Sequence, residues 1–301
     1  MPLLKSWLAR FRLQARGRQI TAIISARPRA WLWGVGLALA LGGCSALRLS
    51  YNNAPTLLYW WLDGYADFDK SQGAQSRAEL SKLLDWHRKE ELPRIADLLG
   101  SAQLLAGGPV VSGPQVCAFY EKALTRMDAL SERVLPSAAA IVPSLTNAQL
   151  DYMAKAFEKK TRKWREEYQR IDKFTERTED FYGTLSALQL QQLQAALHQT
   201  KAEENLYFAE VTRRQKLGLT TLAGLQKAEP ASALTALKAW SAQWQHSSDP
   251  VYQDYKIRST TQTCQALAQL HNSASPKQRK KLLATLQSYQ QEALLLHREA
   301  L

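Results

Sequence analysis

Apolar side chains recur at every third or fourth position through nearly all of the chain after residue 74, and no stretch shows the strict alternation of a half-buried strand. This periodicity predicts an all-α fold, namely an elongated bundle of long amphipathic antiparallel helices. A seven-residue repeat indicates one helix over 147–182. Further helices are expected at 230–247, 250–272 and 276–300.

One apolar stripe lies earlier in the chain, on a helix that we expect to end at Pro136, because proline has no N–H to donate within a helix. Its six members are Val116, Tyr120, Ala123, Met127, Leu130 and Val134. A second long helix follows residue 182, and its apolar face contains Leu190, Leu193, Leu197, Tyr207 and Val211. Both patterns are typical of amphipathic helices.

Four motifs of the form S/T-x-x-Q mark expected helix starts. They join Ser112 to Gln115, Thr146 to Gln149, Ser186 to Gln189 and Ser275 to Gln278. In such a capping box the hydroxyl accepts the N–H of the third helical residue, and the glutamine side chain accepts the N–H of the capping residue. Each cap is worth roughly 1 kcal/mol. The motifs are irregularly spaced, which argues against a strict repeat architecture.

The first fifty residues have the order of a bacterial lipoprotein signal peptide. Seven basic residues and no acidic one precede residue 30, and an apolar run follows from Ala30 to Leu41. This run is too short to span a bilayer as a helix. It ends in two glycines, Cys44 and Ser45, which together resemble a lipobox. The resemblance implies cleavage between Gly43 and Cys44 and attachment of lipid, palmitate included, to the new N-terminal cysteine.

We therefore expect Cys44 to tether the mature chain to the outer membrane of a Gram-negative bacterium, where it faces the periplasm. Ser45 supports this location by analogy, because lipoproteins kept in the inner membrane commonly carry Asp there. The alternatives for this segment are a plain membrane anchor and an ordinary buried cysteine. The expected organisation is a signal peptide at 1–43, an aromatic-rich helical segment at 44–110 and a helical bundle at 111–301.

Removal of the signal peptide changes the charge of the protein. The full chain has 39 Lys and Arg against 27 Asp and Glu, a net charge of +12. Without the seven basic residues of the signal peptide, 32 remain (39 − 7) and the net charge falls to +5 (32 − 27). This balance argues against nucleic acid as a partner. With 46% hydrophobic residues, the chain can bury a sizeable core.

Two further cysteines, Cys117 and Cys264, follow Cys44. An even count in an oxidising compartment makes a disulfide between them one alternative. The other alternative is a pair of unbonded buried thiols. The sequence leaves both open, because it does not give the distance between the two Cα atoms.

The most unusual mature stretch is aromatic and follows closely on the expected lipid. Its four large rings are Tyr59, Trp60, Trp61 and Tyr65. Aromatic rings favour the interface between lipid headgroups and water, so one role is to rest against the bilayer. The other is to plug the bundle, which we favour because three aspartates interrupt the cluster: Asp63, Asp67 and Asp69. These aspartates lack the spacing of an EF-hand loop, so we expect no metal there.

The motifs YNNA at 51–54, LYWWLDGY at 58–65 and W-HR-xx-ELP at 86–93 resemble those of a family of uncharacterised proteobacterial lipoproteins. The resemblance is specific over 44–95. It implies an all-helical outer-membrane lipoprotein with no established activity and carries over no catalytic residue. In addition, LTNAQ at 145–149 is similar to the LTxxQ motif of Spy-type periplasmic chaperones, which are much shorter and not lipidated.

No motif for catalysis or for binding a metal or cofactor stands out. The five histidines are scattered, and His87 and Glu91, one helical turn apart, are typical of a hydrogen-bonded pair. We expect a non-enzymatic protein without metal or cofactor, whose partners are the membrane and other envelope proteins. Two classes remain open, an interaction or chaperone-like helical module and a structural component of an outer-membrane assembly. An exposed apolar groove would favour the first, and fully packed seams with charged outer faces the second.

Overall fold

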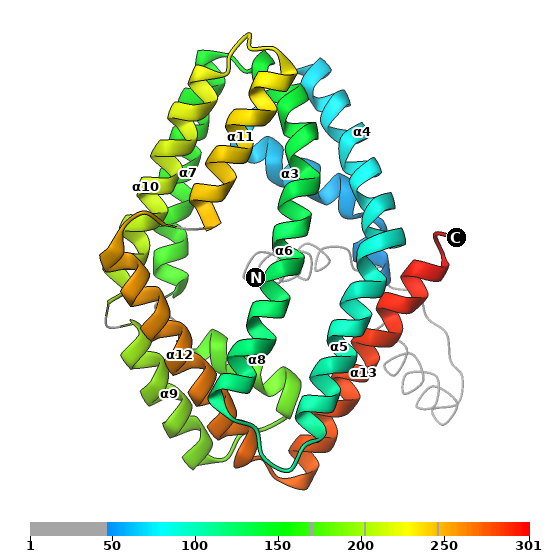
Figure 1. The fold of residues 1–301 in the computed structure, drawn as a ribbon, viewed down its shortest axis with the longest axis vertical. Coiled ribbons are helices and arrows are strands. Elements are labelled where there is room, and N and C mark those ends of the chain that lie inside the picture. Colours follow the sequence, from blue (N-terminus) through cyan, green and yellow to red (C-terminus); the bar gives the residue numbers. More distant parts are fainter. Residues whose placement is uncertain (1–46, 169–170, 202, 246) are drawn as a thin grey trace, which may run out of the picture. The chain divides into compact units, whose positions relative to one another are not determined.

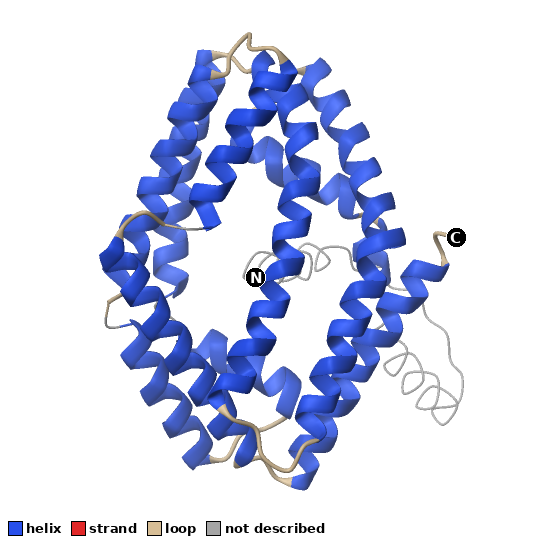
Figure 2. Ribbon diagram, viewed as in Figure 1, coloured by secondary structure: helices blue, strands red, loops and turns tan. Residues whose placement is uncertain are grey.

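The chain folds almost entirely into helices. The computed structural model describes residues 47–168, 171–201, 203–245 and 247–301. Within these ranges no residue lies in a strand (Figure 2). The predicted all-α helical bundle is confirmed.

Residues Arg48–Leu301 form one compact unit, which contains both the aromatic-rich segment and the bundle that follows residue 110. Gly43 and Cys44, with the rest of the expected signal peptide, lie outside the described residues. No helix in the described part of the chain is both long enough and apolar enough to cross a membrane.

The helices follow a short helical stretch at 47–52 and are connected by brief turns. In chain order they are α3 (Ala54–Ala66), α4 (Lys70–Trp86), the π-helical turn η1 (His87–Glu91), α5 (Leu92–Gly107), α6 (Gly113–Ile141), the 3₁₀ turn η2 (Val142–Ser144), α7 (Asn147–Tyr168), α8 (Ile171–Tyr182), α9 (Ala187–Lys201), α10 (Glu204–Gly224), α11 (Pro230–Gln245), α12 (Pro250–Asn272) and α13 (Pro276–Arg298). The last three begin where prediction placed them. Each starts at a proline, whose missing N–H costs nothing in the first turn of a helix.

Two predicted long helices each contain two of the helices in the structure. The helix predicted over 147–182 contains α7 and α8, and residues 169–170 between them lie outside the described residues. The two helices have different neighbours, since α7 lies against α10 and α3 whereas α8 lies against α13 and α9. The second expected long helix likewise contains α9 and α10. A continuous period along the sequence does not reveal where the packing partner changes.

The prediction that Pro136 ends its helix is wrong, because α6 continues to Ile141. Within a helix, Pro136 leaves the carbonyl of Glu132 without its N–H partner. Both residues are exposed, so water can satisfy that carbonyl. The cost of the proline is therefore reduced at this position.

The buried apolar side chains that the structure describes gather in several clusters between helices. The largest joins the end of α6 to η2, α7, α10 and α11 around Ala139, Leu150 and Leu237. Another joins α5 to α13 through Leu92, Ala96, Ala293 and Leu296. Two more pack α5 on α13 and α9 on α12.

Helix α6 runs through the middle of the view in Figure 1. Its first turns are attached to α12 and its last turns to α11. Its neighbours between these ends include α4 and α5. Helix α6 therefore connects the part of the unit that contains α12 with the part that contains α11.

Candidate functional site

Tyr59 is buried and lies on the side of α3 that packs against α4. The Arg77 guanidinium lies 3.5 Å from the centre of its ring, and the centre of the Phe68 ring is 6.5 Å away. Gly73 on α4 makes room for this tyrosine, because a Cβ there would lie 2.8 Å from the Tyr59 hydroxyl. A cation over an aromatic face is attractive, so Tyr59 attaches α3 to α4.

Tyr65 fixes the end of the same helix against α7. The Lys160 ammonium lies 3.2 Å from the centre of its ring and donates a hydrogen bond of 2.9 Å to the Gly64 carbonyl. The Phe157 ring is 5.5 Å away. Burial raises the pKa of Tyr65 and lowers the pKa of Lys160. Tyr59 and Tyr65 therefore have the packing role that we predicted.

The two tryptophans of α3 are largely exposed, although the Trp61 ring contacts the Tyr65 ring edge-on, with the ring centres 5.1 Å apart. Trp60 is 56% exposed and Trp61 is 40% exposed, with Leu58 also exposed beside them. The four aromatic residues thus divide into two tyrosines that face the bundle and two tryptophans that do not. The membrane role stays a prediction for the tryptophans alone.

The three aspartates shape the corner between α3 and α4. Asp63 accepts the N–H of Phe68 at 3.0 Å. Asp69 is the N-cap of α4 and accepts the N–H of Gln72 at 2.8 Å. Asp67 ends α3 in a left-handed conformation, with φ of 48°. In the described part of the chain no group of three or more His, Cys, Asp or Glu side chains is arranged to hold a metal ion.

A single π-helical turn, η1, joins α4 to α5. Pro93 follows it, and in an uninterrupted α-helix the proline ring would clash with the carbonyl four residues earlier. In η1 the Leu92 N–H reaches back five residues to the His87 carbonyl. The Arg88 carbonyl would be next, but Pro93 has no N–H to give it. His297 Nδ1 lies 2.9 Å from that oxygen and must donate to it, which ties α13 to η1.

The YNNA and W-HR motifs meet at this turn. The Tyr51 hydroxyl lies 2.7 Å from His87 Nδ1, and Asn52 accepts a hydrogen bond of 2.7 Å from Arg88. Burial raises the pKa of Tyr51 to about 12, although Arg88 acts in the opposite direction. Burial also lowers the pKa of His87. Both groups are neutral at pH 7, so they form a neutral hydrogen bond that holds the N-terminal stretch in place.

Glu91 lies in the same turn and is 1% exposed. Neither of its carboxylate oxygens has a hydrogen bond, so the expected pair with His87 is not formed. Arg94 and Arg126 lie 3.7 Å and 3.6 Å from the same oxygen. Because Arg126 belongs to α6, this buried ion pair attaches the middle of α6 to η1.

Along its middle, helix α6 contacts α4 and η1 with polar side chains. Besides Arg126, the Arg133 guanidinium lies 5.7 Å from the centre of the Trp86 ring. The Ser137 hydroxyl donates a hydrogen bond of 2.6 Å to Glu79 on α4. Along its middle, α6 is therefore attached to α4 and η1 through charged and hydroxyl groups.

The apolar stripe of α6 is only partly covered by the described residues. None of its six predicted members is buried. Tyr120, Met127 and Val134 are 40%, 42% and 37% exposed. They are seven residues apart and so share one side of the helix. An amphipathic helix inside one domain normally buries this side, so the stripe of α6 is covered less than usual, although Leu135 and Ala139 near the end of the helix are buried.

Gln72 and Gln149 form what we call the first glutamine pair. Their buried side-chain amides exchange hydrogen bonds of 3.3 Å and 2.6 Å. Each side-chain oxygen also accepts the N–H of the capping residue three positions earlier. Each nitrogen also donates, at 2.9 Å, to the carbonyl two residues before the other cap, which is Ser144 for Gln72 and Asp67 for Gln149. Both donors and both acceptor positions of each amide are thus used.

Gln189 and Gln278 form the second glutamine pair, with the same arrangement. Their amides exchange hydrogen bonds of 3.2 Å and 2.9 Å. Gln189 donates to the Ser273 carbonyl at 3.1 Å, and Gln278 donates to the Thr184 carbonyl at 2.9 Å. Each pair therefore joins two turns between helices that are distant in the sequence. The first pair lies where α4 and α7 begin, and the second where α9 and α13 begin, at the opposite end of the view (Figure 1).

The capping box of α4, formed by Asp69 and Gln72, is a functional element that the four predicted motifs do not include. Those motifs were defined by Ser or Thr, although Asp is an equally good N-cap. A usable signal lies just before the cap, where Phe68 precedes Asp69 as Leu145 and Leu185 precede two of the predicted boxes.

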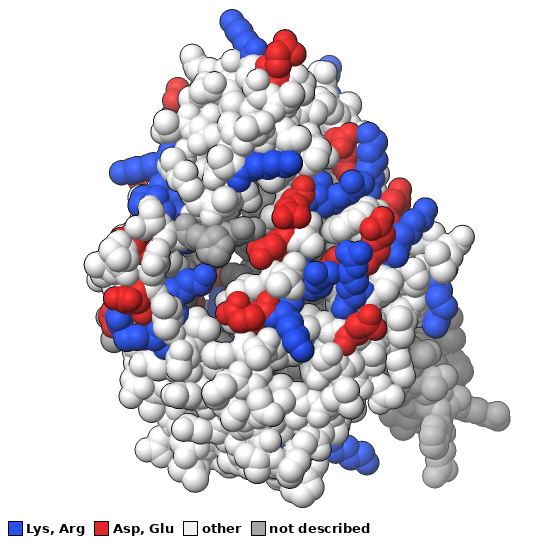
Figure 3. Space-filling model, in the orientation of Figure 1, with Lys and Arg blue, Asp and Glu red and all other residues white. Residues whose placement is uncertain are grey.

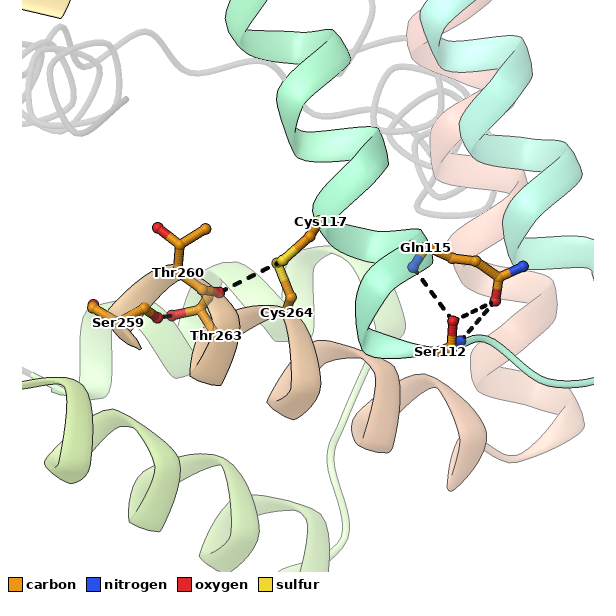
Figure 4. Close-up of a disulfide and its surroundings, with 7 residues drawn as sticks. All are labelled: Ser112, Gln115, Cys117, Ser259, Thr260, Thr263 and Cys264. Carbon is orange, nitrogen blue, oxygen red and sulfur yellow. Dashed lines mark hydrogen bonds between the residues drawn. A yellow bond between two sulfur atoms is a disulfide. The ribbon is translucent and has the colours of Figure 1, made fainter. Parts of the chain in front are cut away.

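The Ser112 box is present but stands alone at the start of α6. The Ser112 hydroxyl accepts the Gln115 N–H at 3.3 Å, and both side chains are exposed (Figure 4). In the next turn Cys117 forms a disulfide with Cys264 of α12, with the two Cα atoms 5.5 Å apart. Of the two alternatives for these cysteines, the structure has the disulfide.

Comparison with protein families gives one match. The model of a family of unknown function, DUF6279, matches residues 64–232, more than half of the chain. The matched region includes the W-HR-xx-ELP motif, α6 and the first glutamine pair, whereas YNNA at 51–54 precedes it. No curated protein and no solved structure matches the chain.

Proposed function

The chain belongs to the family of unknown function DUF6279, and we propose that it is a lipid-anchored lipoprotein of the outer membrane, facing the periplasm. Its role there is to bind other envelope proteins as a helical interaction module with chaperone-like character, without enzymatic activity. The observation that carries this proposal is the partly exposed apolar stripe of α6.

The argument from α6 is energetic. Exposed apolar area costs roughly 25 cal/mol per Å², so an apolar stripe left uncovered is a surface that gains free energy when a partner covers it. The charged side of α6 is already engaged with η1 and α4. The helix therefore cannot turn to bury Tyr120, Met127 and Val134 without breaking those contacts. No described residue covers these three side chains fully, and we propose that a partner protein does so.

The composition of this surface suits a segment of another protein that offers apolar side chains. Met127 at its centre has an unbranched, adaptable side chain that tolerates different partners. Glu121, Lys122 and Glu132 are exposed on the same helix and supply charges of both signs. Figure 3 shows Lys, Arg, Asp and Glu interspersed across the middle of the molecule. An apolar centre combined with charged residues elsewhere on the exposed surface is typical of transient protein interfaces.

The proposed location rests on the lipobox-like segment that ends at Cys44 and on the cysteine chemistry. The disulfide between Cys117 and Cys264 is of the kind that persists in oxidising compartments such as the periplasm. The resemblance of residues 44–95 to uncharacterised lipoproteins points to the same location.

An aggregation assay tests the interaction role. The purified chain should suppress aggregation of an unfolded client, and the Met127→Asp, Val134→Asp variant should lose most of that effect because it places charge on the apolar stripe. The matched control is Leu104→Asp, Ile257→Asp, which changes two exposed apolar residues on α5 and α12. No suppression at stoichiometric excess would remove the chaperone-like role. Equal losses in both variants would remove the assignment to α6.

A separate measurement tests the anchor. Mass spectrometry of the mature N-terminal peptide should find diacylglycerol and an acyl chain on Cys44. A mature chain that begins at another residue, or an unmodified Cys44, would overturn the lipoprotein assignment without affecting the aggregation assay.

The second candidate is a structural component of an outer-membrane assembly. It is favoured by the two glutamine pairs and the disulfide, which connect helices that are distant in the sequence and stiffen the unit. A photo-crosslinker at Met127 in living cells separates the two roles. One constant partner in stoichiometric yield would indicate an assembly component, whereas many partners in low yield would indicate a chaperone-like module.

A further inference from the structure

We propose that the outer side of α3, formed by Leu58, Trp60 and Trp61, lies in the headgroup region of the bilayer that holds the lipid on Cys44. The proposal rests on the proposed function, because it takes the lipid anchor as given. It adds a second membrane contact, which would set the orientation of the helical unit on the membrane.

The chemistry of this surface suits a lipid interface. Four residues of α3 are exposed, and none of them is charged: Thr56, Leu58, Trp60 and Trp61. An indole combines a large apolar body with one N–H donor, and tryptophan is enriched at the level of the headgroups for this reason. Exposed apolar rings that face water continuously would be unfavourable, whereas the headgroup region accommodates both parts of the side chain.

The rotation of α3 about its axis is fixed by contacts on its other side. Tyr59 is held by Arg77, and Tyr65 is held by Lys160, so the tryptophans cannot exchange places with the tyrosines. Asp63 accepts the N–H of Phe68 in the turn that follows the helix. The acidic residues that interrupt the aromatic cluster in the sequence therefore serve the corner with α4 and do not interrupt the exposed surface.

The length of the chain keeps this surface close to the anchor. Three residues separate Cys44 from Arg48, where the compact unit begins, and the four Cα–Cα steps between them reach at most about 14 Å when fully extended. From Arg48 to Trp60 the chain is almost wholly helical and advances about 18 Å at most. Trp60 thus lies within roughly 30 Å of the lipid along any path. A lipid on Cys44 inserts into a bilayer. The surface of that bilayer therefore lies within this distance of Trp60.

A fluorescence experiment on the full lipidated chain tests the proposal. The lipid occupies Cys44 and the disulfide occupies Cys117 and Cys264, so an introduced cysteine is the single free thiol. We would label Leu58→Cys with an environment-sensitive fluorophore and reconstitute the protein into vesicles of phosphatidylethanolamine and phosphatidylglycerol. The vesicles contain a phospholipid spin-labelled near the headgroup. Ile257→Cys on α12, which replaces an equally apolar residue that is 65% exposed, is the matched control.

The label at position 58 should be quenched severalfold more strongly than the label at position 257. Trp60→Ser and Trp61→Ser, added to Leu58→Cys, should remove most of that difference, whereas Val251→Ser added to Ile257→Cys should change nothing. Equal quenching at both positions in a chain whose mass shows the lipid would overturn the α3 contact and leave the anchor intact.

Absence of the lipid in the mass spectrum would instead overturn the proposed function. In that case the same labelled chains, mixed with preformed vesicles, still decide the matter. Binding that depends on Trp60 and Trp61 supports the membrane contact of α3, and no binding overturns it.

Discussion

The glutamine pairs and the Ser112 box share one sequence motif, yet only the pairs connect distant parts of the molecule through it. Gln149 and Gln278 are buried and bonded to a second glutamine from another turn. Gln115 is exposed and bonds to Ser112 at its own helix start. The start of α6 is attached to its neighbour by the Cys117–Cys264 disulfide instead. A capping box defines where a helix begins, and the neighbouring turn decides whether its glutamine also becomes a tertiary contact.

The difference depends on which hydrogen bonds each glutamine side chain makes. In each pair the two amides satisfy each other, two capping N–H groups and two turn carbonyls, so no buried polar group is left over. An exposed glutamine can exchange its bonds for bonds to water at little cost. The paired motif is therefore sensitive to substitution, and the isolated motif is not.

Removal of the disulfide should have the largest effect. For a cross-link between residues separated by 147 positions, the entropy lost by the unfolded chain corresponds to roughly 5 kcal/mol at most. We expect the Cys117→Ala, Cys264→Ala variant to lose about 3–5 kcal/mol of unfolding free energy in urea. A loss smaller than that of Gln149→Ala would contradict the view that the covalent bond is the main attachment of the α6 start.

Substitution of a paired glutamine should come next. Gln149→Ala removes the hydrogen bond to the Asp67 carbonyl, the capping bond to the Thr146 N–H and both bonds to the buried Gln72 amide, so we expect a loss of about 2–4 kcal/mol. Gln115→Ala is the matched control at the isolated box and should lose about 1 kcal/mol or less. Urea denaturation of the two variants measures both. Similar losses would show that burial of the pair adds nothing to the capping box.

A double-mutant cycle measures the coupling within a pair and between the two pairs. Gln72→Ala and Gln149→Ala should couple by about 1–2 kcal/mol, because each removes the partner of the other. Gln149→Ala and Gln278→Ala belong to different pairs and should add to within about 0.5 kcal/mol. Coupling of similar size in both cycles would indicate that the two ends of the unit do not behave independently.

The smallest effect concerns pH and distinguishes the two pairs. His271 lies two residues before Ser273 in the second pair and accepts or donates a hydrogen bond of 3.1 Å with Tyr182. Burial, with Arg279 nearby, lowers the pKa of His271. The folded state therefore binds a proton less readily than the unfolded state, so stability is lost as pH falls below about 6.5, the pKa of an unperturbed histidine.

Hydrogen exchange between pH 7 and pH 5.5, corrected for intrinsic rates, should show protection falling at the start of α9 and α13 before it falls at the start of α4 and α7. His271→Gln should remove this difference. Equal losses at both pairs in the unsubstituted chain would argue against a role for His271.

Much of the fold could be predicted from short stretches of the sequence. The starts of α11, α12 and α13 follow from proline and capping residues, and the boxes at Thr146, Ser186 and Ser275 follow from the S/T-x-x-Q pattern. These features are local, because a cap satisfies backbone groups within its own first turn. The Asp69 box could have been found by the same reasoning with Asp admitted as a cap.

The candidate sites were less accessible to prediction. The periodicity of α6 shows that Tyr120, Met127 and Val134 share one side, but it does not show what covers that side. Likewise the aromatic composition of α3 does not show that Tyr59 and Tyr65 pack inward while Trp60 and Trp61 are exposed. That division depends on Arg77 and Lys160, which come from other helices. The π-helical turn could be suspected from Pro93, but its partner His297 lies far along the chain.

Local sequence patterns are enough to predict that this protein is helical, where most of its helices begin and which side of each helix is apolar, because these properties depend on backbone hydrogen bonds and periodicity within a few residues. The pairing of the glutamines, the bond between Cys117 and Cys264 and the partial exposure of the apolar side of α6 become visible in the folded chain. These outcomes depend on contacts between residues far apart in the chain. Such contacts are set by how all helices pack together, and no local pattern encodes them.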